Sequence, residues 1–144
     1  MLRTVARPSR AFLPLLALAL ASCSSSETID QQSKRAASTA QAAVLLSDAW
    51  LSGAAPSHYA SSALQTFAET LADAGRQVES ASPSDRGKRD SLAAAVTRLS
   101  NAARRAKDAV EAEQDAQVGQ AQQDLRAAQA DLAAAYRQYF AQQQ

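Results

Sequence analysis

Residues 60–78 read ASSALQTFAETLADAGRQV, and the spacing of the apolar side chains in this stretch predicts an amphipathic helix. Apolar residues recur at intervals of four and three positions, which places them on one face of an α-helix. Such a face is stable only when it is buried against another element, so the stretch indicates a helix that packs in a bundle. The face consists of Ala60, Leu64, Phe67, Leu71, Ala74 and Val78.

Three further segments carry a stripe of the same kind on either side of this helix. Thr28, with Gln31 three residues on, predicts the start of the first helix, and residues 52–56 break it. After a second break at residues 80–83, Ser82 as N-cap and Pro83 at the first helical position predict the start of the third helix. The stripes are Ile29, Ala36, Ala40, Ala43, Val44 and Trp50; Leu92, Val96, Leu99, Ala103, Ala106 and Val110; and Ala121, Leu125, Ala128, Leu132, Ala135 and Tyr139.

The connection between the last two stripes leaves two folds open, because the only helix breaker there is Gly119. A turn at residues 117–120 gives four helices in an antiparallel bundle. Without a turn, residues 84–142 form one helix of roughly 85–90 Å at 1.5 Å per residue. Local helix propensity favours the long helix, whereas burial of the last stripe within one chain favours the turn. We therefore expect an all-α, antiparallel four-helix bundle, with a continuous third and fourth helix as the alternative.

The composition supports a single helical domain. Alanine supplies 36 of the 144 residues, glycine and proline supply four each, and aromatic residues make up only 5% of the chain. This scarcity of turn and strand formers argues against a disordered chain, a collagen-like rod and a β-sandwich. A net charge of +1 gives no basic face for nucleic acid, so we expect no nucleic-acid partner.

The first 22 residues have the pattern of an export signal. Arg3, Arg7 and Arg10 precede an apolar run over residues 11–21. At about 11 residues the run is shorter than the roughly 20 that a membrane-spanning helix needs. We therefore expect residues 1–22 to be a signal peptide that is removed. The remaining chain keeps 12 of the 15 basic side chains and all 14 acidic ones.

The run ends in Leu20-Ala21-Ser22-Cys23, which contains the only cysteine of the chain and resembles the lipobox of bacterial lipoproteins. The resemblance implies that the Cys23 thiolate receives a diacylglyceryl group, that the chain is cut before Cys23, and that the new amine is acylated with a palmitate-type chain. The alternative is an unmodified cysteine after an ordinary secretory signal. The resemblance further implies an organisation in which residues 23–27 form a lipidated tether and residues 28–144 form the bundle.

The residue after the cysteine bears on the location. In this family an aspartate at that position tends to retain the protein in the inner membrane, and here the position is Ser24. The resemblance therefore implies the periplasmic leaflet of the outer membrane, or the outer face of the only membrane in a host with one membrane. Lipid chains on Cys23 make the bilayer the first expected partner.

A weaker local likeness connects the segment after Cys23 to the murein lipoprotein family, which is a helical family that crosslinks to peptidoglycan. Cys23-Ser24-Ser25 and Ile29-Asp30-Gln31 are similar to the start of that helix. Pro56 and Pro83 interrupt the rod of that family, and the position of its linking lysine is occupied by Gln144. We therefore carry over no peptidoglycan attachment.

The sequence carries no recognisable catalytic, metal or cofactor motif. His58 is the only histidine, and a single histidine without cysteine or clustered carboxylates does not make a metal site. No glycine-rich phosphate loop and no G-x-S-x-G motif occurs. We therefore expect no enzyme activity, no cofactor and no bound metal.

Tyr136, Tyr139 and Phe140 are the candidate docking residues, because they form an aromatic group near the C-terminal end. The ordinary interpretation of such a group is a plug at the end of the core, and the alternative is a surface that binds a partner. The sequence thus predicts a non-enzymatic structural or protein-binding module of the cell envelope that associates with itself or with an envelope protein. An accessory subunit of a secretion or envelope-assembly complex is the alternative, and a small-ligand carrier or hydrolase is a third.

Overall fold

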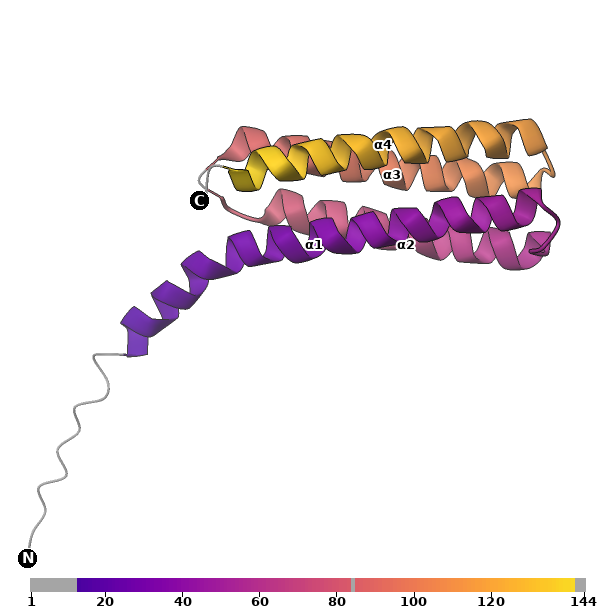
Figure 1. The fold of residues 1–144 in the computed structure, drawn as a ribbon. Helices are drawn as coiled ribbons and strands as arrows, with labels where there is room; N and C mark the ends of the chain where they lie inside the picture. The colour runs from indigo at the N-terminus through magenta and orange to yellow at the C-terminus, as the bar shows by residue number, and fades with distance from the viewer. Residues whose placement is uncertain (1–12, 84, 142–144) are drawn as a thin grey trace, which may run out of the picture.

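The chain folds into four helices that pack as an antiparallel bundle (Figure 1). The computed structural model describes residues 13–83 and 85–141, with side chains from residue 25 onward. Within these ranges no strand occurs, and no helix combines the length and apolar character that crossing a membrane requires. The prediction of an all-α four-helix bundle is therefore confirmed. The helices are α1 (Leu13–Leu51), α2 (Ser57–Ser80), α3 (Arg86–Glu111) and α4 (Asp115–Ala141).

Each helix packs against the helices that precede and follow it, and α1 also packs against α4. This arrangement closes the bundle around one core. The α1–α2 and α3–α4 loops lie together at one end, which we call the distal end. The α2–α3 loop and the end of α4 lie at the other, proximal end, where the first turns of α1 project beyond the bundle (Figure 1).

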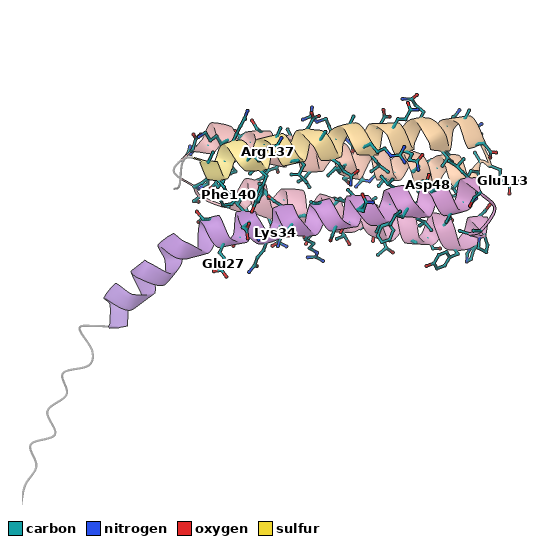
Figure 2. All side chains as sticks on the ribbon, viewed as in Figure 1. Glu27, Lys34, Asp48, Glu113, Arg137 and Phe140 are labelled. Atoms are coloured by element: carbon teal, nitrogen blue, oxygen red, sulfur yellow. The ribbon has the colours of Figure 1, made fainter. Side chains whose placement is uncertain are left out.

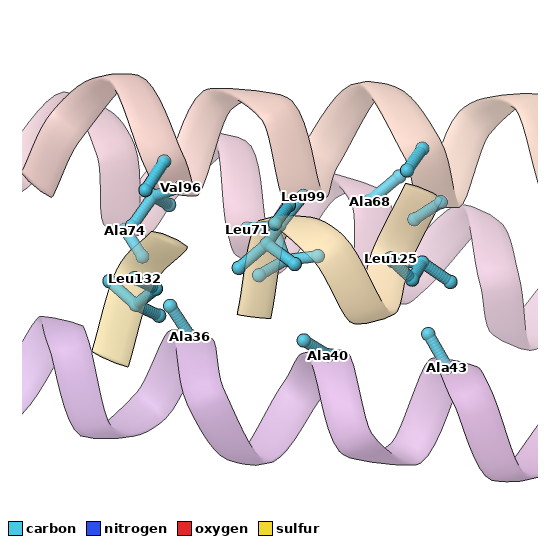
Figure 3. Packing of buried hydrophobic residues seen from close by; sticks show 14 of the residues in the cluster. Ala36, Ala40, Ala43, Ala68, Leu71, Ala74, Val96, Leu99, Leu125 and Leu132 are labelled. Atoms are coloured by element: carbon cyan, nitrogen blue, oxygen red, sulfur yellow. The ribbon is translucent and has the colours of Figure 1, made fainter. Parts of the chain in front are cut away.

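The core is made from the predicted stripes and is rich in alanine. The stripe residues of α3 and α4 are all buried, whereas Trp50 and Phe67 are only half-buried. In Figure 3, Ala36, Ala40 and Ala43 of α1 point toward Leu125 and Leu132 of α4. Small side chains on α1 leave room for the larger leucines of the facing helices.

The turn between α3 and α4 lies at residues 112–114, so the predicted position at 117–120 is wrong. Glu113 adopts a left-handed backbone conformation with φ of 53°, and the amide of Gln114 donates to the carbonyl of Ala109 at 2.9 Å. The turn comes early because Val118 is fully buried and must already be helical to reach the core. Asp115 in the first turn of α4 also interacts favourably with the helix dipole.

Gly119 lies inside α4, where its freedom of conformation is not needed. A Cβ atom at this position would meet no other atom within 4 Å. We therefore expect Gly119→Ala to raise the free energy of unfolding by about 1 kcal/mol, because alanine loses less backbone entropy than glycine in a helix. Urea denaturation followed by circular dichroism would measure the change. A loss of stability would mean that residue 119 is not in a regular helix.

Two predicted helix starts are also wrong. Helix α1 begins at Leu13 and passes without a break through Thr28, so Thr28 is not an N-cap. The physical reason is that neither glycine nor proline occurs between Pro14 and Gly53. The role of residues 23–27 as a lipidated tether remains a prediction. Helix α3 begins at Arg86, and its N-cap is Asp85, whose carboxylate accepts a hydrogen bond from the amide of Lys88.

Candidate functional site

The aromatic group of α4 lies at the proximal end and packs mainly on itself. The ring centroids of Tyr136 and Phe140 are 4.6 Å apart, and those of Tyr139 and Phe140 are 4.8 Å apart. Tyr139 is only 4% exposed, and the other two rings are half-buried. These contacts agree with a plug at the end of the core. The area left for a partner is limited to the edges of Tyr136 and Phe140, and their role in docking remains a prediction.

Tyr136 also ties α4 to α1 through a charged group. Its hydroxyl donates a hydrogen bond to Asp30, and the other carboxylate oxygen of Asp30 accepts from the Lys34 ammonium at 2.9 Å. The hydrogen bond from Tyr136, together with Lys34, holds the pKa of Asp30 below its ordinary value of 3.8. The same hydrogen bond raises the pKa of Tyr136, since the phenol is the donor. The network therefore links the two helices most strongly when Asp30 is ionised and Tyr136 is protonated.

We expect Tyr136→Phe to raise the pKa of Asp30 toward its ordinary value, because the largest cause of the lowering is removed. A carboxylate with a lowered pKa in the folded state adds stability above its unfolded pKa, and this stability is lost as the pH falls below about 4. The variant should therefore show a shallower loss of stability in acid. NMR titration of the Asp30 carboxyl would measure the pKa directly. An unchanged pKa would show that the hydrogen bond does not form in solution.

A groove with apolar walls lies beside this network, between α1 and α4. Its volume is about 410 Å³. Figure 2 places Lys34 on α1 and Arg137 on α4 toward the proximal end of the bundle. Side chains from both helices line the groove, among them Ser33, Lys34, Ala37, Leu132, Ala133 and Arg137.

The polar groups of the groove are incompletely satisfied. Ser33 is only 2% exposed, and its hydroxyl oxygen has no hydrogen-bond partner among the described residues. A serine in a helix usually donates to the carbonyl four residues earlier, as Ser47 does to Ala43 at 2.8 Å. Arg137 is exposed and makes no ion pair with any side chain that the structure describes. The groove could not be predicted from the sequence, because one wall comes from α1 and the other from α4, which are far apart in the chain.

The distal end presents a different feature, namely large apolar side chains in contact with solvent. Leu45 is 57% exposed, Leu51 is 37% exposed and Tyr59 is 62% exposed. All three lie in the last turns of α1 or the first turn of α2. Sequence reasoning missed them too, although Leu45 could have been noticed as a leucine that falls outside the buried stripe of its helix.

His58 is exposed at the start of α2 and takes part in no cluster of metal ligands. Within the described residues, no group of three histidine, cysteine, aspartate or glutamate side chains could hold a metal ion. His58 instead faces a shallow hollow of 290 Å³ that it shares with Lys107 and Glu111, which pair with each other at 3.2 Å. The ion pair leaves no free carboxylate to orient the imidazole.

Helices α1 and α4 are held in register by buried and exposed polar contacts. The side-chain amide of Gln122 donates to the carbonyl of Val44 at 3.2 Å and to the carboxylate of Asp48. Arg126 pairs with the same carboxylate at 3.8 Å. Because Gln122 is buried, these contacts fix the position of α4 along the axis of α1. Their role is to stabilise the packing of the two helices.

No protein family, no curated protein and no solved structure matches this chain. Cys23 lies within α1, but its side chain, like the other residues of the signal and lipobox pattern, falls outside the part of the chain whose side chains the structure describes. The functional argument therefore depends on the sequence pattern at the N-terminus and on the contacts and surfaces of the bundle.

Proposed function

We propose that this chain is a bacterial outer-membrane lipoprotein that is anchored through acylated Cys23 and serves as a non-enzymatic structural or protein-binding module of the cell envelope. The anchor is supported by the order of its signals, in which a basic segment and a short apolar run precede Leu20-Ala21-Ser22-Cys23. Two or more acyl chains hold a protein on a bilayer far more firmly than one chain does. The bundle would then stand in the periplasm on the inner leaflet of the outer membrane.

The observation that carries the proposal is the continuity of α1 from Cys23 into the bundle. Because a helix is stiff, the lipid and the bundle are coupled without a flexible linker. At 1.5 Å per residue, the end of α1 lies about 40 Å from Cys23. Leu45, Leu51 and Tyr59 are therefore exposed at the end of the bundle that is far from the anchor. Apolar side chains held at that distance suit the docking of another envelope protein.

The anchor is tested by two substitutions that act on different steps. Cys23→Ala removes the thiolate, and we expect the protein to leave the membrane fraction for the soluble periplasmic fraction. Ser24→Asp keeps the thiolate, and we expect the protein to stay lipidated but to move from the outer to the inner membrane. Density-gradient separation of the two membranes and mass spectrometry of the N-terminal peptide give the readouts. Membrane association of Cys23→Ala would contradict lipid anchoring.

The docking surface is tested by photo-crosslinking in intact cells, with the reactive residue in place of Tyr59. The control carries the same residue in place of Ala94, which is exposed on α3. A foreign protein crosslinked at residue 59 and not at residue 94 supports a binding module, and such a protein would also identify an envelope machine of which this chain is an accessory subunit. Crosslinks only between copies support a self-associating structural element. Equal or absent crosslinking at the two positions would contradict docking at the distal end.

A further inference from the structure

We propose that the groove between α1 and α4 binds a medium-length acyl chain with an anionic head group, such as a fatty acid. This binding site goes beyond the proposed structural role and does not depend on the lipid anchor. The groove is built from Ser33, Lys34, Ala37, Leu132, Ala133 and Arg137. Its volume of 410 Å³ falls in the range of small-molecule sites in proteins.

The walls of the groove suit an acyl chain. Ala37 and Ala133 are exposed although they lie on helices that face each other, and Leu132 is buried beneath them. These short side chains leave a trough that larger residues would close. Two cross-helix contacts bound the trough, namely Tyr136 to Asp30 at one end and Gln129 to Gln41 at the other. Gln129 and Tyr136 lie seven residues apart on α4, which corresponds to about 10 Å. An acyl chain of medium length would therefore fill the trough between these two contacts.

The polar groups gather at the proximal end of the trough and are suited to an anion. Arg137 lacks an ion pair among the described residues. Lys34 pairs with Asp30, whose carboxylate also accepts a hydrogen bond from Tyr136. Both cations line the groove, and only Lys34 is paired with a carboxylate among the described residues. Ser33 lies beside Lys34 on α1, and its buried hydroxyl has no hydrogen-bond partner among the residues that the structure describes. A carboxylate at this position would accept from Arg137 and Lys34, and a small shift of the Ser33 side chain would supply a third donor.

The experiment measures the binding of decanoate, and of decanol as the uncharged control, by isothermal titration calorimetry below the concentration at which either aggregates. The protein is the processed chain from residue 23, which contains every core residue that the structure describes, with Cys23→Ser to prevent lipidation. We expect decanoate to bind at one site and decanol to bind about three-fold more weakly, in keeping with an exposed ion pair. We expect affinity to rise about two-fold per methylene from octanoate to decanoate, since one side of the chain stays in water.

Matched variants locate the site. Ala133→Trp fills the trough, and we expect it to weaken decanoate at least about ten-fold, whereas Ala94→Trp on the surface of α3 should leave binding unchanged. Arg137→Gln should weaken decanoate about two-fold and leave decanol unchanged, and Arg104→Gln is the control with the same loss of charge. Ser33→Ala should raise the melting temperature yet weaken decanoate, because the hydroxyl is unsatisfied only while the groove is empty.

Several results would overturn the proposal. These are no binding of decanoate, equal binding of decanoate and decanol, or equal effects of Ala133→Trp and Ala94→Trp. Sedimentation that shows a dimer abolished by Ala133→Trp, with no decanoate bound, would assign the groove to a second copy of the chain instead. None of these results bears on the membrane location of the Cys23→Ala variant, so the proposed anchoring is tested separately.

Discussion

We expect Leu99→Ala to lower the free energy of unfolding by about 3 kcal/mol. Leu99 is fully buried in α3, and Figure 3 places it beside Leu71 of α2. Truncation removes the transfer free energy of the lost carbon atoms and leaves a cavity between packed helices. Many of the buried residues are alanines, such as Ala68 and Ala103, and these have no side-chain torsion by which to move atoms into that space. The cavity should therefore persist, and the cost should lie well above that of a surface change.

Urea denaturation followed by far-ultraviolet circular dichroism would measure this loss. Leu45→Ala is the matched control, because Leu45 is 57% exposed and the same atoms are removed. We expect the control to change stability by no more than about 0.5 kcal/mol. Similar losses for the two variants would show that Leu99 does not pack in the core as described.

We expect Ala40→Leu to lower the free energy of unfolding by about 2 kcal/mol, since the larger side chain overpacks the core. Ala40 is fully buried on α1 and points toward α4, between Ala36 and Ala43 (Figure 3). On hydrophobicity and helix propensity alone, leucine at a core position would be neutral or favourable. The expected loss therefore arises because Ala40 is fully buried opposite the leucines of α4, and α1 would have to move outward to accept the new atoms.

The control is Ala94→Leu, which makes the same change at an exposed position on α3, outside the groove. We expect it to alter stability by no more than about 0.5 kcal/mol. Thermal unfolding and urea titration of both variants provide the comparison. A stabilising effect of Ala40→Leu would mean that the α1 seam contains unfilled space, and the description of its packing would then be wrong.

The helical stripes could be predicted from the sequence because they depend on local spacing. Leu64 and Leu71 on α2 lie seven residues apart, as do Leu92 and Leu99 on α3, which is about two helical turns, and all four are fully buried. The loop after α1 could also be predicted, since Gly53 adopts a φ of 79° that favours glycine. Periodicity and breakers act within a few residues, so they can be recognised without knowledge of the neighbouring helices.

The α3–α4 turn shows where such reasoning fails. The turn was predicted at residues 117–120 because Gly119 weakens a helix there. The chain turns instead at residues 112–114, where Glu113 takes the left-handed conformation. The cost of a positive φ at Glu113 is offset by the burial of Val118. Glycine in a helix is less favourable than alanine by about 1 kcal/mol, whereas burying a valine contributes about 2 kcal/mol. The burial of Val118 therefore decides where the chain turns.

The candidate sites also divide into those that the sequence predicts and those that are visible only in the folded chain. Periodicity and breakers were enough to predict a helical chain and the positions of its stripes, and Leu20-Ala21-Ser22-Cys23 carries the pattern on which the proposed anchoring depends. The contacts across helices could be found only in the folded chain. They include the partner of Tyr136, the groove between α1 and α4, and the apolar side chains exposed at the distal end. The physical reason is range, because propensity and periodicity act along a few residues of one helix, whereas a groove exists only once two distant segments are packed side by side.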